Sequence, residues 1–311
     1  MKKKVFSENL NIIRNHLRLN WKLILFFGIF WLIITLGLLS MTLVSHIDGV
    51  KVPVIGNITA EIKKANFTSG DNLISISNML NWGLFSGAGI AFFAIFSLVL
   101  INKNFLKEVN NGQISFWLTL PLSKKQVLQA KISYTMLSNL IIFIPSYLII
   151  LIFAGISYDA KQWFGYVTLY GIQFILFIFL LIILYFFIST FLTDKTMVAN
   201  IINSLIIFWI LVTWVISLFY DMAPDHFKEL KYAQYVSLQS LIVIPLKFSQ
   251  TDISETIVKN LGSGKTLTLE IYQHSSFNNI AISSCTIGIP IITFGLDWLN
   301  IKLFKIKDLN L

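Results

Sequence analysis

The sequence predicts an all-α polytopic membrane protein with six transmembrane helices, an N-terminal amphipathic interfacial helix and short re-entrant helices before the last span. Charged residues make up 13% of the chain, whereas soluble domains carry about 25%. The mean hydropathy is +0.74, and the apolar residues gather in runs long enough for helices that cross a bilayer. These runs are continuous, as in residues 172–188, whereas the strands of a membrane β-barrel alternate apolar and polar residues.

The net charge of +9 and the single cysteine limit the kinds of partner and cofactor. The basic residues lie beside the apolar runs, which favours a role in membrane orientation and headgroup contact over nucleic-acid binding. Cys285 lies within an apolar run, so the sequence can build neither a disulfide nor a cysteine metal site. The first apolar run, residues 23–44, is too long for the core of a cleavable signal, which predicts a permanent span.

Residues 1–22 are predicted to form an amphipathic interfacial helix, followed by a six-span transmembrane domain over residues 23–311. Apolar residues recur at helical spacing on one stripe, and most of the Lys and Arg residues lie off it. Such a helix lies in the headgroup plane, with Trp21 at the boundary. The alternative is an ordinary positively charged flank of the first span. The stripe consists of Phe6, Leu10, Ile13, Leu17 and Trp21.

Six apolar segments are the predicted spans. Pro145 lies in the third span, and its missing N–H predicts a kink. The fifth span contains Asn200 and Asn203, which predict a polar bond to a neighbouring helix. The fourth span is longer than a perpendicular crossing needs, so it is expected to tilt or to protrude. The spans are residues 23–45, 80–101, 132–156, 164–192, 197–219 and 277–299.

The connections between the last three spans differ in length. A tight turn over residues 193–196 joins the fourth span to the fifth. The connection 220–276 is the longest, and it begins with a polar segment. Its apolar run 232–248 is too short, and too broken by Pro245, to cross a bilayer. This run is therefore predicted to be re-entrant or interfacial.

The distribution of basic residues predicts the orientation. Six spans place both termini on one side, and that side carries 15 of the 24 Lys and Arg residues but only 4 of the 15 acidic residues. The opposite side carries the other 9 basic residues and 10 acidic residues. Because cytoplasmic segments are enriched in Lys and Arg, the termini and the loop 102–131 are predicted to be cytoplasmic and the connection 220–276 extracellular.

The loop 102–131 contains a helix end and a helix start. Gly112 follows two asparagines and is expected to end the helical extension of the second span, because glycine accepts the left-handed conformation found at helix ends. Ser123 and Gln126 have the spacing of a capping box, which predicts that a new helix begins at Lys124. The loop is therefore expected to be two helices joined by a short, structured break.

An apolar patch lies within that break. Phe116 and Trp117 are at its centre, and Pro121 closes it. Charged residues that include Glu108 and Lys124 flank the patch, which is the composition of a protein–protein contact. The residues alone leave an alternative open, in which the loop lies on the membrane surface with Trp117 as an interfacial anchor.

A spaced set of acidic, glycine, proline and basic residues runs through this loop and into the third span. The set is Glu108-x-x-x-Gly112, then Leu118-x-x-Pro121-x-Ser123-Lys124, then Lys131. It resembles the first cytoplasmic loop of bacterial ABC-transporter permeases of the second exporter class, in which an acidic residue, a glycine, a Leu-x-x-Pro-x-Ser-Arg run and a lysine follow the second span. Lysine replaces the usual arginine at position 124, which keeps the charge and loses the planar fork. The tail 304–309 and the six-span layout are also similar to that family.

The resemblance implies a permease subunit of an ATP-driven exporter in the cell (plasma) membrane. Such a subunit pairs with a second permease, as a homodimer or a heterodimer, and with cytoplasmic ATP-binding-cassette ATPase subunits. It is not itself an enzyme and binds no cofactor directly, because ATP and Mg²⁺ are held by the ATPase. The cargo would be a peptide, a lipid or a drug-like molecule. The implied coupling residues are Glu108, Gly112, Pro121 and Lys124, to which the physical argument adds Phe116 and Trp117.

Two other classes of protein stay open. An ion-coupled secondary carrier needs no ATPase but usually needs several ionisable groups at mid-membrane, and the sequence has almost none. A membrane enzyme would need a cluster of acid, base or metal-binding residues, and no such cluster is found. A membrane anchor that transports nothing needs no such feature.

Three further signals do not support a site. Residues 261–266 resemble a phosphate-binding loop, but position 259 is a lysine where that motif needs a glycine. The four histidines are scattered, without the helical pairing that zinc sites use. Asp297 is the one acidic residue within a span, and we expect a structural pairing there with water or with Lys302.

Overall fold

The structure, a computed structural model, describes residues 2–43, 84–85, 87–114, 122–156, 160–222, 228–243, 250–260, 266–274 and 279–307. In chain order the elements are α1 (Lys2–Leu43), α3 (Gly87–Ile101), η2 (Asn102–Leu106), α4 (Lys107–Asn110), α6 (Lys124–Ile156), α7 (Ala160–Phe191), η3 (Thr193–Lys195), α8 (Thr196–Met222), η4 (Lys228–Val236), α9 (Ser240–Val243), β1 (Gln250–Asn260), β2 (Thr266–His274) and α10 (Asn279–Ile306).

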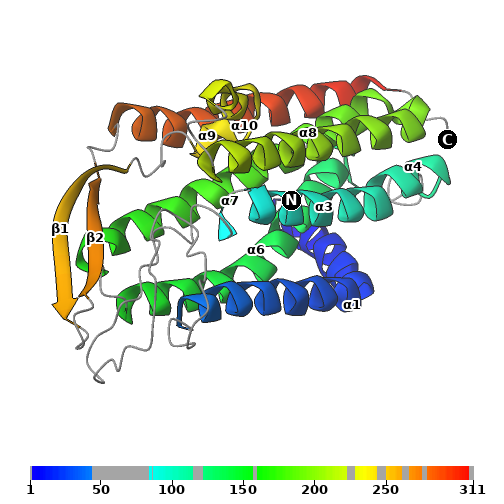
Figure 1. The fold of residues 1–311 in the computed structure, drawn as a ribbon. Coiled ribbons are helices and arrows are strands. Elements are labelled where there is room, and N and C mark those ends of the chain that lie inside the picture. The colour runs from blue at the N-terminus through cyan, green and yellow to red at the C-terminus, as the bar shows by residue number, and fades with distance from the viewer. Residues whose placement is uncertain are drawn as a thin grey trace.

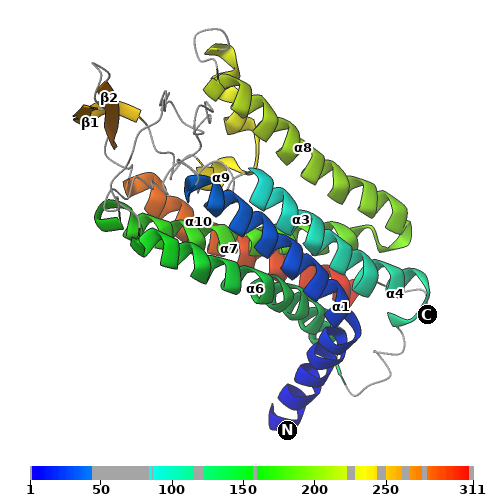
Figure 2. The same ribbon diagram turned by 60° about the horizontal axis from the view of Figure 1, so that its bottom comes forward.

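Six of the described helices are long and apolar enough to cross a membrane, as expected of a multi-pass membrane protein. They lie roughly along one direction, and successive helices run in alternating directions (Figure 1). The second of them is continuous over Gly87–Asn110, because η2 and α4 extend α3 without a break. Element α4 lies at one end of the bundle, and β1 and β2 lie at the opposite end (Figures 1 and 2).

Helices α3 and α7 form the interior of the bundle. Within the most apolar 18 residues of each span, 72% of the residues are buried in the second span, which contains α3, against 11% in α10. Helix α7 packs against α3, α6, α8 and α10. Aromatic rings fill the space between α3, α6 and α7: the ring of Phe174 lies 5.5 Å from those of Phe93 and Phe143. The outer helices therefore present their remaining apolar surface to lipid.

Single hydrogen bonds between side chains join four of the packed helix pairs. A bilayer offers no water to exposed polar groups, so such bonds select which helices pair. The prediction for Asn203 is confirmed, whereas Oδ1 of Asn200 has no hydrogen-bond partner in the described part of the chain. The bonds are Trp31 to Ser146 between α1 and α6 (2.9 Å), Ser97 to Asn139 between α3 and α6 (3.2 Å), Gln173 to Thr286 between α7 and α10 (2.6 Å) and Asn203 to Ser189 between α8 and α7 (3.2 Å).

Helix α1 combines the predicted interfacial helix and the first span. It is one helix of 42 residues, and its N-terminal part bends away from the axis of the rest (Figures 1 and 2). The buried face of the N-terminal part is Ile12, His16 and Asn20. Leu10 and Trp21, from the predicted apolar stripe, are exposed. The bent part thus turns a partly polar face to the bundle and leaves apolar residues for the membrane.

The connection before the last span contains short helices and a β-hairpin. Gln239, between η4 and α9, is buried and donates a hydrogen bond to Thr213 in the middle of α8 (3.2 Å). Trp209 donates to the carbonyl of Val236 at the end of η4 (3.2 Å). The end of η4 and the residue just before α9 therefore pack against the middle of α8, as expected of re-entrant helices. Strands β1 and β2 pair as an antiparallel hairpin outside the helical bundle, which the sequence did not predict.

A substitution at Gly171 can test the close packing of α6 on α7. A Cβ atom at Gly171 would overlap the ring of Tyr147, whose hydroxyl is held by the carbonyl of Thr168 (3.0 Å). Gly171→Ala is expected to lower the free energy of unfolding by about 1–3 kcal/mol, measured as a lower thermal midpoint in detergent. Gly165→Ala, in the same helix but with open space around its Cβ, is the control. Equal midpoints for the two variants would contradict this packing.

Candidate functional site

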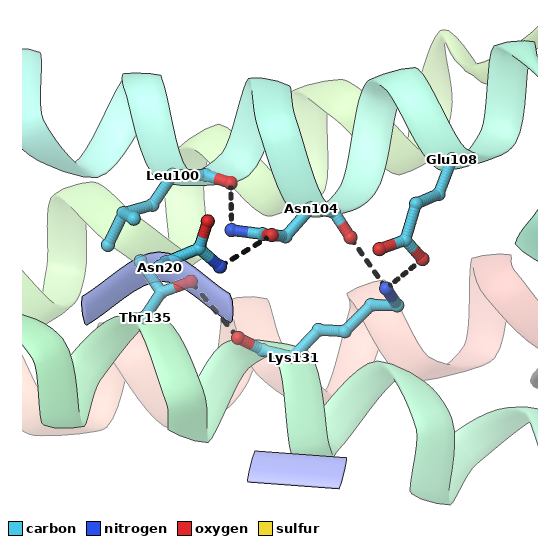
Figure 3. Close-up of polar contacts among 6 residues, drawn as sticks. All are labelled: Asn20, Leu100, Asn104, Glu108, Lys131 and Thr135. Atoms are coloured by element: carbon cyan, nitrogen blue, oxygen red, sulfur yellow. Dashed lines mark hydrogen bonds and ion pairs between the residues drawn. The ribbon is translucent and has the colours of Figure 1, made fainter. Parts of the chain in front are cut away.

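A widened helical turn lies where α3 runs into α4. Residues Asn102–Leu106 form a π-helical turn, in which the N–H of Lys107 bonds to the carbonyl of Asn102. A π-helical turn carries one more residue than an α-helical turn and shifts the carbonyls of the ladder. The carbonyl of Asn104 accepts a bond from outside the helix here (Figure 3). Such turns occur often at functional sites.

Lys131 of α6 reaches into this turn. Its Nζ lies 2.5 Å from the carbonyl oxygen of Asn104 and 2.5 Å from Oε2 of Glu108 (Figure 3). Lys131 is 1% exposed and Glu108 is 13% exposed. The ammonium group therefore bonds to two acceptors on the extension of α3. Both ends of the motif that runs from Glu108 to Lys131 meet in this one contact.

The contact continues into α1 through asparagine side chains. Nδ2 of Asn20 donates to Oδ1 of Asn104 (3.0 Å) and to the carbonyl of His16 (2.9 Å). Nδ2 of Asn104 donates to the carbonyl of Leu100 (3.0 Å). Figure 3 shows Asn20, Asn104 and Lys131 converging from α1, α3–η2 and α6. Three helices are thus joined at the inner end that the sequence predicts, and we call this set of residues the polar junction.

Because the ion pair at the polar junction is buried, it is stable only if its attraction and hydrogen bonds offset the free energy of desolvation. Removing two charges from water costs several kcal/mol for each ion, and their attraction offsets this cost only when the geometry is good and further hydrogen bonds are made. The second acceptor for Lys131, the carbonyl of Asn104, supplies such a bond. Loss of either charged partner leaves the other buried without its counter-charge, so the junction holds the two helices together only while both residues are present.

Two of the three helices at the polar junction have the ends that the sequence predicts: α4, which extends α3, ends there and α6 begins there. Gly112 has a φ of +68°, the left-handed conformation expected at the end of α4. The backbone N–H of Ser123 donates to Oε1 of Gln126 (2.8 Å), and the N–H of Gln126 lies 3.4 Å from the Ser123 hydroxyl, so the capping box is formed. Helix α6 begins at the next residue, Lys124.

A second set of bonds ties the same end of the bundle to α10. Nζ of Lys124 donates to the carbonyl of Lys307 (3.1 Å). Nζ of Lys307 donates to Thr193 Oγ1 (2.8 Å) and Asp194 Oδ2 (3.0 Å) in the turn between α7 and α8. Phe304 is buried one turn earlier in α10. The start of α6, the end of α10 and the α7–α8 turn are therefore connected.

The structure brings together part of the predicted site. Glu108 pairs with Lys131 inside the bundle, Gly112 forms the helix end, and Lys124 bonds to the end of α10. Phe116, Trp117 and Pro121 lie outside the described residues. Glu108 and Lys124 are thus bonded within the chain, where their role is to hold the base of the loop.

Sequence reasoning missed the residues that complete the polar junction. Lys131 was part of the matched motif but was not among the predicted coupling residues, and Asn20 and Asn104 were not singled out. An available signal was the presence of both asparagines in apolar surroundings, because a polar side chain in a membrane helix tends to bond to another helix.

In the described residues, no group of three or more His, Cys, Asp or Glu side chains could hold a metal ion. Comparisons with family models, curated proteins and solved structures found no match to this chain. The polar junction itself consists of charged and amide groups that connect three helices.

The buried ion pair can be tested by a double-mutant cycle. Glu108→Gln and Lys131→Met are each expected to lower the free energy of unfolding by about 3–5 kcal/mol, because each leaves a buried polar group without its partner. The double variant is expected to recover most of that loss. Thermal unfolding of the purified chain in detergent measures all three variants.

The matched control is the exposed pair of Asp194 with Lys307. Asp194 is 68% exposed, so Asp194→Asn is expected to change the stability by less than about 1 kcal/mol. Single variants at Glu108 and Lys131 that are as mild as Asp194→Asn would contradict a buried ion pair.

Proposed function

We propose that this chain is the transmembrane permease subunit of an ATP-driven exporter of the second ABC exporter class. In this proposal it moves a peptide, a lipid or a drug-like cargo outward across the plasma membrane. Separate cytoplasmic ATPase subunits bind ATP and Mg²⁺ and hydrolyse the nucleotide. A second permease, identical or different, completes the pathway.

The observation that carries the proposal is the ion pair between Glu108 and Lys131. These residues flank the loop that resembles the coupling segment of the family, and their contact closes the base of that loop. A loop on a loose base would absorb a push by bending. A loop whose two flanking helices are joined by a buried bond passes the displacement to both helices.

The bonds around the loop support a path for that displacement. Asn104 connects α3–η2 to Asn20 of α1, and Lys124 connects α6 to Lys307 of α10. In the proposed cycle, closure of the ATPase dimer displaces the loop, and these helix ends move with it. ATP then biases an equilibrium between two arrangements of the spans, which is how a ligand drives a conformational change.

The paired aromatic residues of the loop allow a matched test. Phe116→Ala with Trp117→Ala is expected to reduce stimulated ATP hydrolysis by about tenfold or more, because removal of interface aromatics typically costs 2 kcal/mol or more. The measurement uses the chain co-expressed with each candidate ATPase from its source organism and purified as a complex. Complex yield and ATP hydrolysis rate are recorded together.

Two exposed aromatic residues outside the loop are the control. Phe26 of α1 and Phe208 of α8 are 64% and 61% exposed, so Phe26→Ala with Phe208→Ala removes two aromatic side chains away from the loop. This variant is expected to keep both ATPase binding and hydrolysis. Equal activity for the two double variants would contradict coupling through the loop, and transport by the isolated chain on an ion gradient alone would favour a secondary carrier.

The proposal also fixes the orientation of the chain. In a Cys285→Ser background, Ser263→Cys is expected to react with a membrane-impermeant maleimide in intact cells, because it lies in the connection 220–276. Asn111→Cys, at the end of α4, is expected to react only after permeabilisation. The reverse pattern would place the loop outside the cell and contradict the proposal.

A further inference from the structure

A side cavity lies between the bent part of α1 and helices α6 and α10. Its volume is about 440 Å³, which is within the range of small-molecule sites of about 300–1,000 Å³. Each of the three helices contributes a pair of residues four positions apart, which share one face of a helix. The pairs are Asn9 with Ile13, Gln129 with Ser133, and Thr293 with Asp297.

Two buried acceptor atoms belong to residues that line this cavity. Oδ1 of Asn9 and Oδ1 of Asp297 are buried and have no hydrogen-bond partner in the described part of the chain. The hydroxyl of Thr293 already donates to the carbonyl of Ile289 (2.7 Å). Buried polar atoms are normally hydrogen-bonded, so a ligand that brings N–H donors would complement these two residues.

Asp297 does not pair with Lys302, one of the two partners that the sequence predicts. Nζ of Lys302 lies over the ring of Trp298, 3.5 Å from its centroid, and no ion pair of Asp297 is found among the described residues. The expectation of pairing with Lys302 is therefore wrong. Lys125, at the start of α6, acts electrostatically on Asp297 but forms no ion pair with it in the described residues. A carboxylate inside a membrane span is costly unless a counter-charge contacts it, so a cation bound in the cavity would add the direct ion pair that Lys125 does not make.

The rest of the wall is apolar and reaches the lipid-facing surface. Phe294 and Leu10 line the cavity and are 75% and 48% exposed. Gln129 lies five residues after the start of α6, about 8 Å along the helix axis. Asp297 lies nine residues before the end of α10, about 14 Å along its axis. The polar end of the cavity is thus near headgroup depth, with apolar residues beside it.

We propose that this cavity binds an amphiphile with a primary ammonium group, which Asp297 and Asn9 hold while its apolar part lies against Phe294 and Leu10. The ammonium group provides three N–H donors and a positive charge in direct contact with Asp297. Two sources share this chemistry, an aminolipid of the bilayer and a soluble long-chain amine. The inference does not depend on an ATPase and can be tested on the isolated chain.

The test compares an amine with an alcohol of equal chain length. Purified full-length chain in a neutral maltoside detergent is titrated with dodecylamine or with 1-dodecanol, and the thermal midpoint is measured. Dodecylamine is expected to raise the midpoint by about 3 °C or more above dodecanol, because a ligand that binds the folded state stabilises it. Equal shifts for the two compounds would overturn the proposal.

Three variants test whether dodecylamine raises the thermal midpoint by binding in this cavity. Asp297→Asn is expected to weaken the apparent affinity for dodecylamine tenfold or more, and Glu229→Gln, which removes one exposed acidic charge elsewhere, is expected to leave it unchanged. Ser133→Phe keeps Asp297 and fills the cavity from an exposed position, so it is expected to abolish the shift while the chain stays folded. A shift that persists in Ser133→Phe, or that Glu229→Gln weakens as much as Asp297→Asn does, would overturn the proposal.

Lipid discs separate the two sources. The chain is released from discs of equal phosphatidylethanolamine and phosphatidylglycerol into native mass spectrometry. Retained phosphatidylethanolamine that is lost in Asp297→Asn identifies a membrane aminolipid. Binding of dodecylamine without retained phosphatidylethanolamine identifies a soluble amine. Retention of both lipids in equal amounts, unchanged in Asp297→Asn, would contradict an ammonium site.

Discussion

The buried pair of Glu108 and Lys131 is the interaction on which the end of the bundle that holds α4 depends. Hydrocarbon cannot satisfy a charge, so both residues must find their partners within the protein. The π-helical turn of η2 supplies the additional acceptor, the carbonyl of Asn104, without ending the helix. The local widening of one helix thus allows a charged residue of another to be buried beside it.

The middle of the bundle and the end that holds α4 are stabilised by different interactions. In the middle, aromatic rings such as those of Phe93 and Phe174 pack together, and single hydrogen bonds join neighbouring helices. At the end that holds α4, a buried ion pair and amide groups bond in specific directions. These bonds fix how α1, the extension of α3 and α6 lie against one another at that end.

Much of the fold was predictable because lipid requires long apolar helices. All six spans, the left-handed Gly112 and the capping box of Ser123 follow from local patterns. Several helices continue past the predicted apolar core, whereas the helix of the second span begins at Gly87 and not at residue 80 as predicted. The buried face of α1 was not predictable from an apolar stripe, because it includes His16 and Asn20. The β-hairpin was not predicted, although polar and apolar residues alternate over residues 266–271, as they do in a half-buried strand. The polar junction depends on which helices pack together, and no local pattern contains that information.

Helix α6 connects the two polar regions of the molecule. Lys131 and Gln129 are two residues apart, which places them about 200° apart around the helix. One face of α6 thus carries the ion pair to Glu108, and the opposite face lines the cavity that Asp297 closes. A rotation of α6 that strains the ion pair also displaces Gln129 and Ser133 from the cavity wall. An amphiphile bound in the cavity and a force applied to the loop would therefore act on the same helix. If the amphiphile binds more tightly to one position of α6 than to the other, its binding changes the free energy needed to move the loop by the same amount.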